Sequence, residues 1–487
     1  MSLRNHLGKA TFWKVENRKM LLCRPYIMGI LNVTPDSFSD GGEHFDAAAA
    51  IEFGRQLVAQ GADIIDIGGE STRPGAADVT EEQELARVID VVRALASEGI
   101  CVSIDTRHAS VAKACVEAGA QIINDITGFS NEEMIEVAAS CDAGLIAMHM
   151  QGTPQSMQAN PSYGDVVAEI GEYLAQRAAA LEAEGVEPSR ICIDPGPGFG
   201  KNVRHNLELM ACFDELSELG YPLMAAYSRK TTLGKITGVS EASKRIESSV
   251  AAALLTYMGG ACIFRVHDVA QTVEALAVAA NMAFARSFRE GGNPMLLPGK
   301  LALVSLGSNI GNSVETIVEA TRAIGASKGI EVIASSSIYK TEPAYYLEQG
   351  TFANSVAWVQ TSLGHYELLE RLFEIEQEFH RVRTIANGPR TLDLDLIDYE
   401  GVVSDDPRLT LPHPRVMERA FTVEPLLELS AIMARSFGRY AAIGEIREGV
   451  CEENPFGLRL ADGQLIVRDR IEHGAIVGKL LDASEVI

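Results

Sequence analysis

Eight short apolar runs, rich in β-branched residues, recur through the first half of the chain, with longer segments of helical periodicity between them. The runs cover residues 26–31, 63–67, 101–104, 121–126, 144–148, 191–194, 222–227 and 261–266. Continuously apolar strands are typical of parallel sheets, which are buried on both faces. Eight such units in about 250 residues predict a TIM (β/α)8 barrel rather than a doubly wound sheet. We expect the preceding segment, which contains Trp13, to cover the bottom of this barrel.

Length and charge narrow the class of protein. A chain of 487 residues is too long for one ordinary core, which predicts two domains. The formal net charge of -24 argues against a nucleic-acid partner, because such partners are bound by basic patches that neutralise phosphates. It remains compatible with phosphorylated small molecules, which need only a local cluster of Arg, Lys or Mg²⁺.

The cysteines and the hydropathy pattern predict a cytoplasmic protein. The eight cysteines are scattered without a CxxC pair, which argues against a disulfide framework and against a zinc site. No apolar run reaches the roughly 20 residues of a membrane-spanning helix, and the N-terminus lacks the apolar region of a signal peptide. We therefore expect no membrane partner.

Polar residues follow most of the apolar runs, at the point where each predicted strand ends. The segments are NVTPDSFSDGG (32–42), GGESTRPG (68–75), SIDT (103–106), NDI (124–126), DPGPGFGK (194–201), SRK (228–230) and RVHD (265–268). In a parallel barrel these ends share one mouth, where active sites lie. Asp105, Asn124 and Asp194 then surround its centre, which suits a flat, nitrogen-rich ring with N–H donors. Taken singly, each of these residues could merely cap a loop.

In this order the motifs resemble those of dihydropteroate synthase, over residues 1–290. The resemblance implies a barrel that joins a pyrophosphorylated dihydropterin to p-aminobenzoate and releases pyrophosphate. It implies a pterin site made of Asp105, Asn124, Met148, Asp194 and Lys230. It implies a p-aminobenzoate site made of Phe38, Thr72, Arg73, Pro74, Phe199 and Ser228, and a pyrophosphate site made of Asn32, Arg73, Arg265 and His267.

The same resemblance assigns catalytic roles to Lys230, Arg265 and His267 and makes Asn32 a Mg²⁺ ligand. Support of the leaving group by charge is then the main contribution, and no protein nucleophile is needed. Two positions depart from the family pattern, since Ala226 stands where Gly is usual and Pro197 stiffens a loop that often carries an aromatic residue.

The pattern of elements changes after the segment REGGNPMLLPGK (289–300), whose Gly, Pro and Asn residues indicate a boundary, and we place a linker at 291–299. Beyond it we predict strands at 301–306, 331–339, 354–360 and 393–399, with helices after the first and the third. This β-α-β-β-α-β order fits a ferredoxin-like α+β sandwich over residues 300–435.

Two aspartates in GPRTLDLDL (388–396) mark the second candidate site. Asp393 and Asp395 are two residues apart on a strand, hence on one face, where they can share Mg²⁺ ions that bridge nucleotide phosphates. The nearby Arg381, Arg383 and Arg390 suit a polyphosphate. The alternative is a solvated acidic edge.

This half resembles 6-hydroxymethyl-7,8-dihydropterin pyrophosphokinase, with GSN (307–309), YKTEP (339–343), FAN (352–354) and PHPRVMERAF (412–421) as further matches. The resemblance implies ATP as co-substrate, with metals on Asp393 and Asp395. It implies an ATP site made of Glu376, Arg381, Arg383, Arg390, His413 and Arg419, and a pterin site made of Thr341, Phe352, Asn354 and Phe421. The catalytic residues it implies are Asp393, Asp395, Arg381 and Arg390.

Residues 436–487 match the second family poorly, and we predict an extension of unknown role with a hairpin around 461–463 followed by a helix. The loop from Arg383 to Arg390 is also one residue short, with Asn387 at a position where Trp occurs in some members.

The two resemblances name consecutive steps of folate synthesis, which predicts a bifunctional enzyme that uses Mg²⁺ in both domains. A homodimer through the last helices of the barrel is expected by the same resemblance. Two alternatives remain at this point: a pterin-binding methyltransferase barrel, and a chain in which one domain has lost catalysis and serves in binding.

Overall fold

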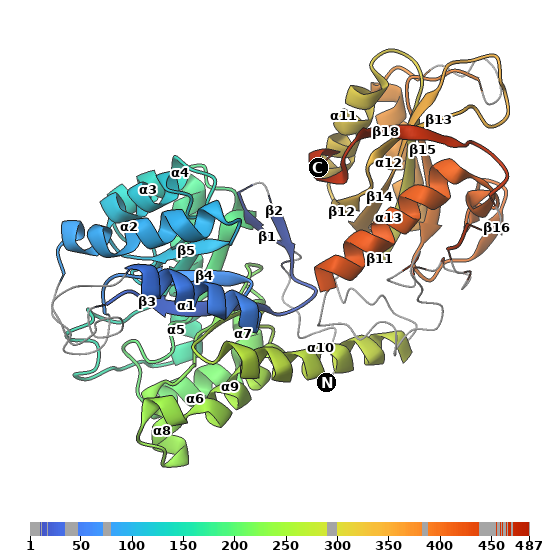
Figure 1. Ribbon diagram of the computed structural model, residues 1–487. Helices are drawn as coiled ribbons and strands as arrows, with labels where there is room; N and C mark the ends of the chain where they lie inside the picture. Colours follow the sequence, from blue (N-terminus) through green and yellow to red (C-terminus); the bar gives the residue numbers. More distant parts are fainter. Residues whose placement is uncertain are drawn as a thin grey trace. The chain divides into compact units, whose positions relative to one another are not determined.

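The computed structural model describes residues 10, 12–16, 18–34, 47–71, 79–289, 300–381, 388–437, 454, 458, 460, 464, 466–468 and 471–486. The chain divides into two compact units, Met1–Ala280 and Asn281–Ile487 (Figure 1). The predicted linker 291–299 lies outside the described residues.

The first unit is an eight-stranded parallel barrel, as predicted. Its strands run in the order β8-β7-β6-β5-β4-β3-β10-β9, and a parallel bridge between Ile193 and Leu223 connects the two ends of this order. The strands are β3 (Tyr26–Asn32), β4 (Ile64–Gly68), β5 (Val102–Asp105), β6 (Ile122–Asp125), β7 (Gly144–Met148), β8 (Ile191–Asp194), β9 (Met224–Ala225) and β10 (Ile263–Val266).

Helices between the strands form the outer ring of the barrel (Figure 1). The sequence starts them with local hydrogen bonds: Thr80 and Gln83 form a capping box at the first turn of α2, and the Asp165 carboxylate caps α5. The helices are α1 (Ala47–Gln60), α2 (Glu81–Ser97), α3 (Ala109–Glu117), α4 (Glu132–Ala139), α5 (Val166–Ala183), α6 (Val203–Ala211), α7 (Phe213–Ser217), α8 (Thr231–Thr237), α9 (Ile246–Met258) and α10 (Val269–Arg289). Within the described part of the chain, none of the helices combines the length and apolarity needed to cross a membrane.

A two-stranded hairpin of β1 (Phe12–Val15) and β2 (Arg18–Leu21) covers the bottom of the barrel, as expected for this segment. Trp13 is fully buried among the first residues of the barrel strands, and its indole N–H donates to the Arg190 carbonyl oxygen over 2.8 Å. The N-terminal ends of the strands are therefore sealed, which leaves their C-terminal ends as the open mouth.

The second unit is an antiparallel sheet with helices. The sheet runs in the order β15-β11-β14-β13-β18, and β12 pairs with another part of β14. Every residue of β14 is buried, so both faces of the sheet are covered. Helices α11 and α12 pack on one face, while α13 lies against β13 and β14 on the other (Figure 1).

The bounds of this unit are β11 (Lys300–Ser308), α11 (Ser313–Ala326), β12 (Ile330–Ser335), β13 (Ile338–Thr341), β14 (Phe352–Thr361), α12 (His365–Glu378), β15 (Asp393–Tyr399), β16 (Ser404–Asp406), β17 (Leu409–Leu411), α13 (Ala420–Phe437), β18 (Ile476–Leu481) and α15 (Ala483–Val486). The predicted strand–helix order for residues 300–435 is thus observed, and β16 and β17 form a separate small hairpin.

The structure differs from the prediction at two places in this unit. The single strand predicted at 331–339 is divided into β12 and β13, because the Ser336 hydroxyl takes the place of a backbone acceptor and receives the N–H of Val356 over 3.0 Å. A helix does follow the predicted hairpin of the C-terminal extension, as the short α15, but the strand β18 before it, which pairs with the free edge of β13, was not predicted. Residues 461–463 of the predicted hairpin lie outside the described residues, although Leu460 N–H donates to the Gln464 carbonyl oxygen across them.

Candidate active sites

The strand register brings the predicted polar residues of the barrel into one row at its mouth. Asn32, Gly68, Asp105 and Asn124 are paired in succession across β3, β4, β5 and β6. On the next two strands Met148 is paired with Asp194. The row exists because each β-strand ends at the same level, so the side chains that follow the apolar runs meet at one edge.

Arg265 lies between two carboxylates at the centre of this mouth. Its Nε donates to Asp66 Oδ2 and its Nη2 to Asp105 Oδ2, each over 2.6 Å. Asp66 is fully buried and also accepts a longer hydrogen bond of 3.3 Å from the Asn124 amide. Sequence reasoning missed Asp66, although a charged residue inside the apolar run IIDIG is the signal that could have revealed it.

Burial shifts the pKa values of the acids and the lysine toward neutrality. It raises the pKa of Asp105 to about 7, although Arg265 acts in the opposite direction. It raises the pKa of Asp194 to about 6, against the hydrogen bond from Gly196 N–H and the charge of Lys230. Burial also lowers the pKa of Lys230 to about 8, with Arg265 adding to the effect. Small changes in the surroundings therefore decide the charge of these three groups near neutral pH.

The loop from Asp194 to Lys201 places an aromatic ring against Lys230. The Phe199 ring centroid lies 4.2 Å from Lys230 Nζ. A second lysine, Lys201, is 3% exposed and donates from Nζ to the carbonyl oxygens of Gly196 and Phe199. Gly196 has a φ of 62°, and a Cβ there would lie 2.0 Å from the His149 carbonyl oxygen, so the turn requires glycine. Sequence reasoning did not identify Lys201, whose role is visible only once the loop is folded.

A cavity of about 960 Å³ opens at this mouth. Its wall includes seven of the predicted residues: Asn32, Asp105, Phe199, Ser228, Lys230, Arg265 and His267. Ser228 Oγ lies 3.1 Å from His267 Nδ1, which pairs these two side chains. Asn124, Met148 and Asp194 are at most 3% exposed and lie behind that wall. Phe38, Thr72, Arg73 and Pro74 fall outside the described residues.

In the second unit the central strands bring Asn354 and Asp393 to either side of Gly307. Gly307 is paired with both residues, and Asp395 is paired with Ser305 two positions along β11. A Cβ at Gly307 would lie 2.8 Å from Asn354 Oδ1, so glycine is needed to leave the Asn354 side chain in place. Asn354 Nδ2 donates to Thr341 Oγ1 over 2.6 Å, which joins a third strand to the group.

Asp393 lies between two arginines. Arg381 contacts one of its carboxylate oxygens over 2.5 Å, and Arg390 contacts the other over 2.7 Å. Arg381 also binds Glu376, which accepts the N–H of Leu394 over 2.7 Å. Burial raises the pKa of Asp393, and the neighbouring carboxylate of Asp395 raises it further. Burial raises the pKa of Glu376 to about 6.

The two aspartates have the chemistry of a divalent-cation site. Across the described residues, no group of three or more His, Cys, Asp or Glu side chains has the arrangement of a metal centre. Asp393 and Asp395 nevertheless both line the cavity, and repulsion between them is relieved by a cation. Protein sites for Mg²⁺ commonly supply one or two carboxylates, and the remaining ligands are water and phosphate. The pair therefore fits such an ion.

Aromatic rings and arginines form the rest of a cavity of about 490 Å³. Arg390 lies over the Phe352 ring at 5.6 Å, and Arg419 lies over the Phe421 ring at 5.4 Å. Tyr345, which sequence reasoning missed, contacts Arg419 through its hydroxyl over 3.2 Å. The wall includes ten predicted residues: Thr341, Phe352, Asn354, Arg381, Arg390, Asp393, Asp395, His413, Arg419 and Phe421.

The remaining predicted residues of this site differ in their surroundings. Glu376 is 3% exposed and lies behind the wall, where it holds Arg381. Burial, with Arg419 and Arg415 nearby, lowers the pKa of His413 to about 4, so this imidazole is neutral at physiological pH. Arg383 and Asn387 lie outside the described residues.

Comparisons with known proteins match each half of the chain to a protein family. The family of pterin binding enzymes matches residues 28–267, and the 7,8-dihydro-6-hydroxymethylpterin-pyrophosphokinase family matches residues 303–431. Dihydropteroate synthase of Neisseria meningitidis serogroup B is 47% identical over 272 residues, which are 55% of this chain and 95% of that protein. The enzyme of Escherichia coli K12 is 45% identical over 258 residues, which are 53% and 91%.

Solved structures give the same result for the barrel. Dihydropteroate synthase of Burkholderia cenocepacia, complexed with 7,8-dihydropteroate, is 42% identical with a TM-score of 0.53, and the match covers 58% of this chain and 99% of that one. The Xanthomonas albilineans enzyme with 4-aminobenzoic acid is 45% identical with a TM-score of 0.51, and the match covers 54% and 94%.

Proposed function

This chain belongs to the dihydropteroate synthase family and carries, C-terminal to the barrel, a 7,8-dihydro-6-hydroxymethylpterin-pyrophosphokinase domain. From this premise we propose how its own residues perform two consecutive steps of folate biosynthesis. The second unit transfers a pyrophosphoryl group from ATP to the hydroxymethyl group of the dihydropterin. The barrel then joins that product to p-aminobenzoate, with loss of pyrophosphate. The relatives reported above are synthases, which decides against the methyltransferase alternative.

In the barrel, the pterin ring lies at the row of strand ends. Asp105, Asn124 and Asp194 accept its N–H donors, and Lys230 donates to its carbonyl oxygen and ring nitrogen. The observation that supports this arrangement is that Arg265 binds Asp66 and Asp105 together, at a cavity whose wall includes Arg265, Asp105 and Lys230.

Arg265 has a further part in the synthase step. Its Nη2 is bound to Asp105 before substrate arrives. When a ring N–H donor takes that carboxylate oxygen, the Nη2 group is free to donate to the leaving pyrophosphate, while Asp66 still holds Nε. His267 and Ser228 lie on the same wall and add donors. Asn32 would hold a Mg²⁺ ion there, which would supply positive charge to the leaving pyrophosphate. Phe199 and Ser228 line the p-aminobenzoate position, together with Phe38, Thr72, Arg73 and Pro74.

In the kinase site, Asp393 and Asp395 would hold Mg²⁺, which would supply positive charge to the polyphosphate. Arg381, Arg390 and Arg419 donate to phosphate oxygens, and His413 contacts the nucleotide in its neutral form. The pterin ring lies between Phe352 and Phe421, and Asn354 recognises its edge. Transfer here depends on positioning and charge neutralisation more than on a strong base.

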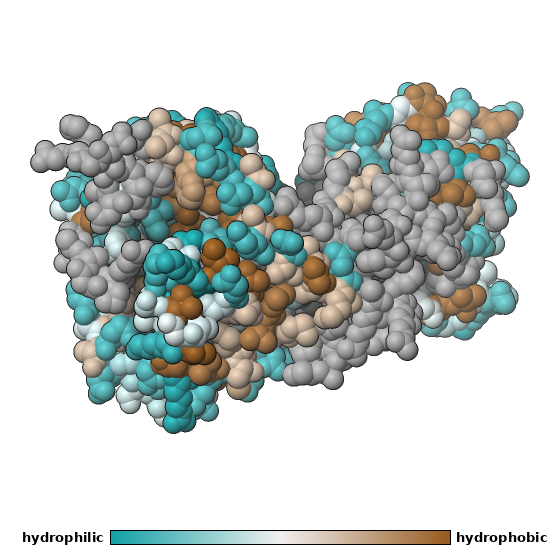
Figure 2. Space-filling model, turned by 60° about the horizontal axis from the view of Figure 1, so that its bottom comes forward, coloured by the Kyte–Doolittle hydropathy of each residue, from teal (hydrophilic) through white to brown (hydrophobic). Residues whose placement is uncertain are grey.

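We also propose that the barrel forms a homodimer through its last helices. Leu255 on α9 and Val278 on α10 are 58% and 70% exposed, which is unusual for large apolar side chains on helices of one surface. Figure 2 brings the side of α8, α9 and α10 forward and shows apolar side chains gathered on this face of the first unit.

The described cysteines are all free thiols, in keeping with a reducing, cytoplasmic location.

One assay on the full-length chain tests both activities. The enzyme receives 6-hydroxymethyl-7,8-dihydropterin, ATP, Mg²⁺ and p-aminobenzoate, and AMP and dihydropteroate are followed together. We expect both products from the unmodified chain, no AMP from Asp393→Ala, and AMP without dihydropteroate from Lys230→Ala. If dihydropteroate fails to form even when the pyrophosphorylated pterin is supplied, the barrel is not a working synthase.

A further inference from the structure

The C-terminal extension folds back onto the kinase unit, although the pyrophosphokinase family match ends at residue 431. Strand β18 pairs antiparallel with β13, with Ile476 opposite Thr341 and Leu481 opposite Ile338. Thr341 is one of the residues that line the kinase cavity. A segment outside the family match is thus hydrogen-bonded to a strand that builds the site.

The four residues before β18 connect two walls of the cavity through their backbone. The Glu418 carbonyl oxygen accepts the N–H groups of Glu472 and His473 over 2.8 and 3.0 Å. Ala420 N–H donates to the His473 carbonyl oxygen over 2.9 Å, which completes a parallel bridge beside Arg419. On the opposite wall, Glu342 N–H donates to the Ala475 carbonyl oxygen over 3.0 Å.

Side chains in the same segment touch the residues that face the substrates. The His473 ring lies edge-on to Tyr345, with 5.1 Å between ring centroids. Tyr345 in turn receives a hydrogen bond from Arg419. Gly474 lies directly under Phe421, because a Cβ added there would be 2.4 Å from Phe421 Cδ1. The segment therefore sets how far this ring and this arginine can move.

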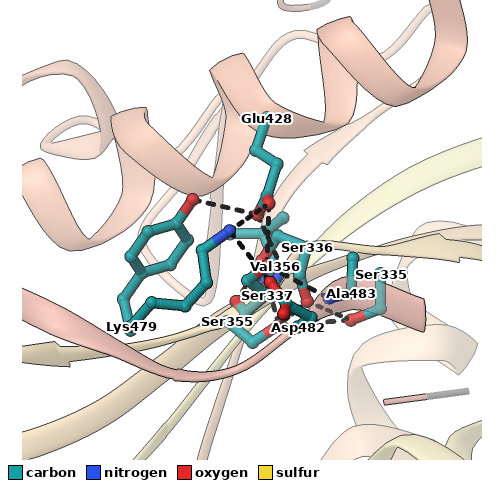
Figure 3. Close-up of polar contacts among 10 residues, drawn as sticks. Ser335, Ser336, Ser337, Ser355, Val356, Glu428, Lys479, Asp482 and Ala483 are labelled. Atoms are coloured by element: carbon teal, nitrogen blue, oxygen red, sulfur yellow. Dashed lines mark hydrogen bonds and ion pairs between the residues drawn. The ribbon is translucent and has the colours of Figure 1, made fainter. Parts of the chain in front are cut away.

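A polar cluster anchors the far end of β18 (Figure 3). Glu428 on α13 accepts the N–H and hydroxyl of Ser337, each over 2.7 Å, and the ammonium group of Lys479 over 3.0 Å. Ala483 N–H donates to Ser337 Oγ over 3.1 Å. Burial opposes the charge of Glu428, but the hydrogen bonds from Ser337, Lys479 and Tyr339 outweigh it and lower its pKa. The strand is therefore held at both of its ends.

We propose that residues 472–475, held in place by β18, are a positioning segment of the kinase site, and that they fix Phe421 and Arg419 for binding of the dihydropterin and ATP. This inference rests on the proposed pyrophosphokinase activity of the second unit. In that reaction, residues 472–475 do not contact the reacting atoms of the substrates. They act through the rings and the arginine that they support.

Two glycines of the same segment provide a matched test in the full-length chain. Gly474→Ala puts a methyl group against the Phe421 ring, and Gly474 also has a φ of 72°, which alanine tolerates poorly. Gly478→Ala places its methyl group in open space on β18. We expect Gly474→Ala to raise the kinase KM for 6-hydroxymethyl-7,8-dihydropterin about fivefold or more, the effect of one lost aromatic contact. Gly478→Ala should match the unmodified enzyme.

Synthase activity of each variant, assayed with the pyrophosphorylated pterin and p-aminobenzoate, reports whether the rest of the chain is intact. Equal kinase KM values for the two glycine variants would overturn the inference. An unmodified chain that makes no AMP would instead contradict the proposed function itself.

If Gly474→Ala fails to fold, a second pair of variants tests the positioning role of residues 472–475. His473→Ala removes the ring that contacts Tyr345, and His473→Phe keeps an aromatic ring there. We expect the alanine variant to raise the KM for ATP or pterin and the phenylalanine variant to restore it. Unchanged KM values in His473→Ala would refute a positioning role.

Discussion

The two sites use the same arrangement of charges with the signs reversed. In the barrel one arginine, Arg265, lies between two aspartates, whereas in the kinase unit one aspartate, Asp393, lies between two arginines. An acidic surrounding suits a ring that offers N–H donors, and a guanidinium surrounding suits phosphate oxygens. The same kind of ion-paired triad thus suits hydrogen-bond donors of a ligand in one site and hydrogen-bond acceptors of a ligand in the other.

The difference also concerns the strands that build the two triads. The barrel triad comes from three parallel strands, β4, β5 and β10, which lie close together in the sheet although β10 is far from the other two in the sequence. The kinase triad has Asp393 on β15 and its arginines in the segments before that strand, so most of it is local in sequence. Removal of Arg265, the central residue of the barrel triad, should therefore lower activity and stability more than removal of Arg381, a flanking residue of the kinase triad.

Arg265→Leu has the largest expected effect. It removes a donor to the leaving group, and we expect the synthase kcat to fall about 10³-fold. It also leaves Asp66 and Asp105 without their cation, which should lower the free energy of unfolding of the barrel by about 3–5 kcal/mol. Steady-state kinetics and thermal unfolding measure the two effects.

The control for this variant is Arg24→Leu, which breaks the ion pair with Asp63 at the sealed end of the barrel. It should destabilise the protein and leave the synthase kcat unchanged. If Arg265→Leu keeps its kcat, the comparison between the two triads has no catalytic meaning.

Arg381→Leu should have the next largest effect. It removes one of the two cations on Asp393 and releases Glu376, so we expect the rate of AMP formation to fall about 10²-fold while the synthase rate stays unchanged. Arg371→Leu on α12 is the matched control, because its partner Glu374 lies on the surface and such pairs contribute little. Equal rates in the two leucine variants would show that Asp393 needs only Arg390.

The two activities should depend on pH in different ways. Outside its optimum, the synthase kcat/KM should change about tenfold per pH unit. The synthase kcat/KM should fall below about pH 6–7, where Asp194 and Asp105 become protonated, and above about pH 8, where Lys230 loses its proton. Asp105→Asn should move the acid limb to lower pH. The kinase should show no limb from His413, which is neutral above about pH 4.

The same shifts predict how stability depends on pH. Asp105 and Asp194 have higher pKa values in the folded barrel than in the unfolded chain, where they are near 4. The folded state therefore binds more protons between about pH 4 and 7, and the contribution of these groups to the free energy of unfolding falls as pH rises through that window. Asp105→Asn should flatten this dependence in thermal unfolding measured from pH 4 to 8.

The smallest expected effect on rate comes from Val278→Asp. A charge on this exposed apolar position of α10 should prevent self-association without reaching either site. Sedimentation should show a dimer for the unmodified chain and a monomer for the variant, with both rates within about twofold. A monomeric unmodified chain would contradict the proposed dimer and leave the comparison of the triads intact.

The fold of both units, and the place of most candidate site residues at the ends of their strands, could be predicted from the sequence itself. Continuous apolar runs specify buried parallel strands, and the polar residue that ends each run lies at the mouth because all parallel strands end there. Likewise, Asp393 and Asp395 share a face because strand side chains alternate. These are local rules, so they can be read from residues that are near one another in the chain.

Only the tertiary structure decided which charges meet. Arg265 and Asp66 are 199 residues apart, and Lys201 reaches its carbonyl partners only through the folded loop. Strand β18 was not predicted because its position depends on the free edge of β13, which exists only after the sheet has formed. Pairings between distant segments depend on packing and burial, and no local pattern in the sequence records them.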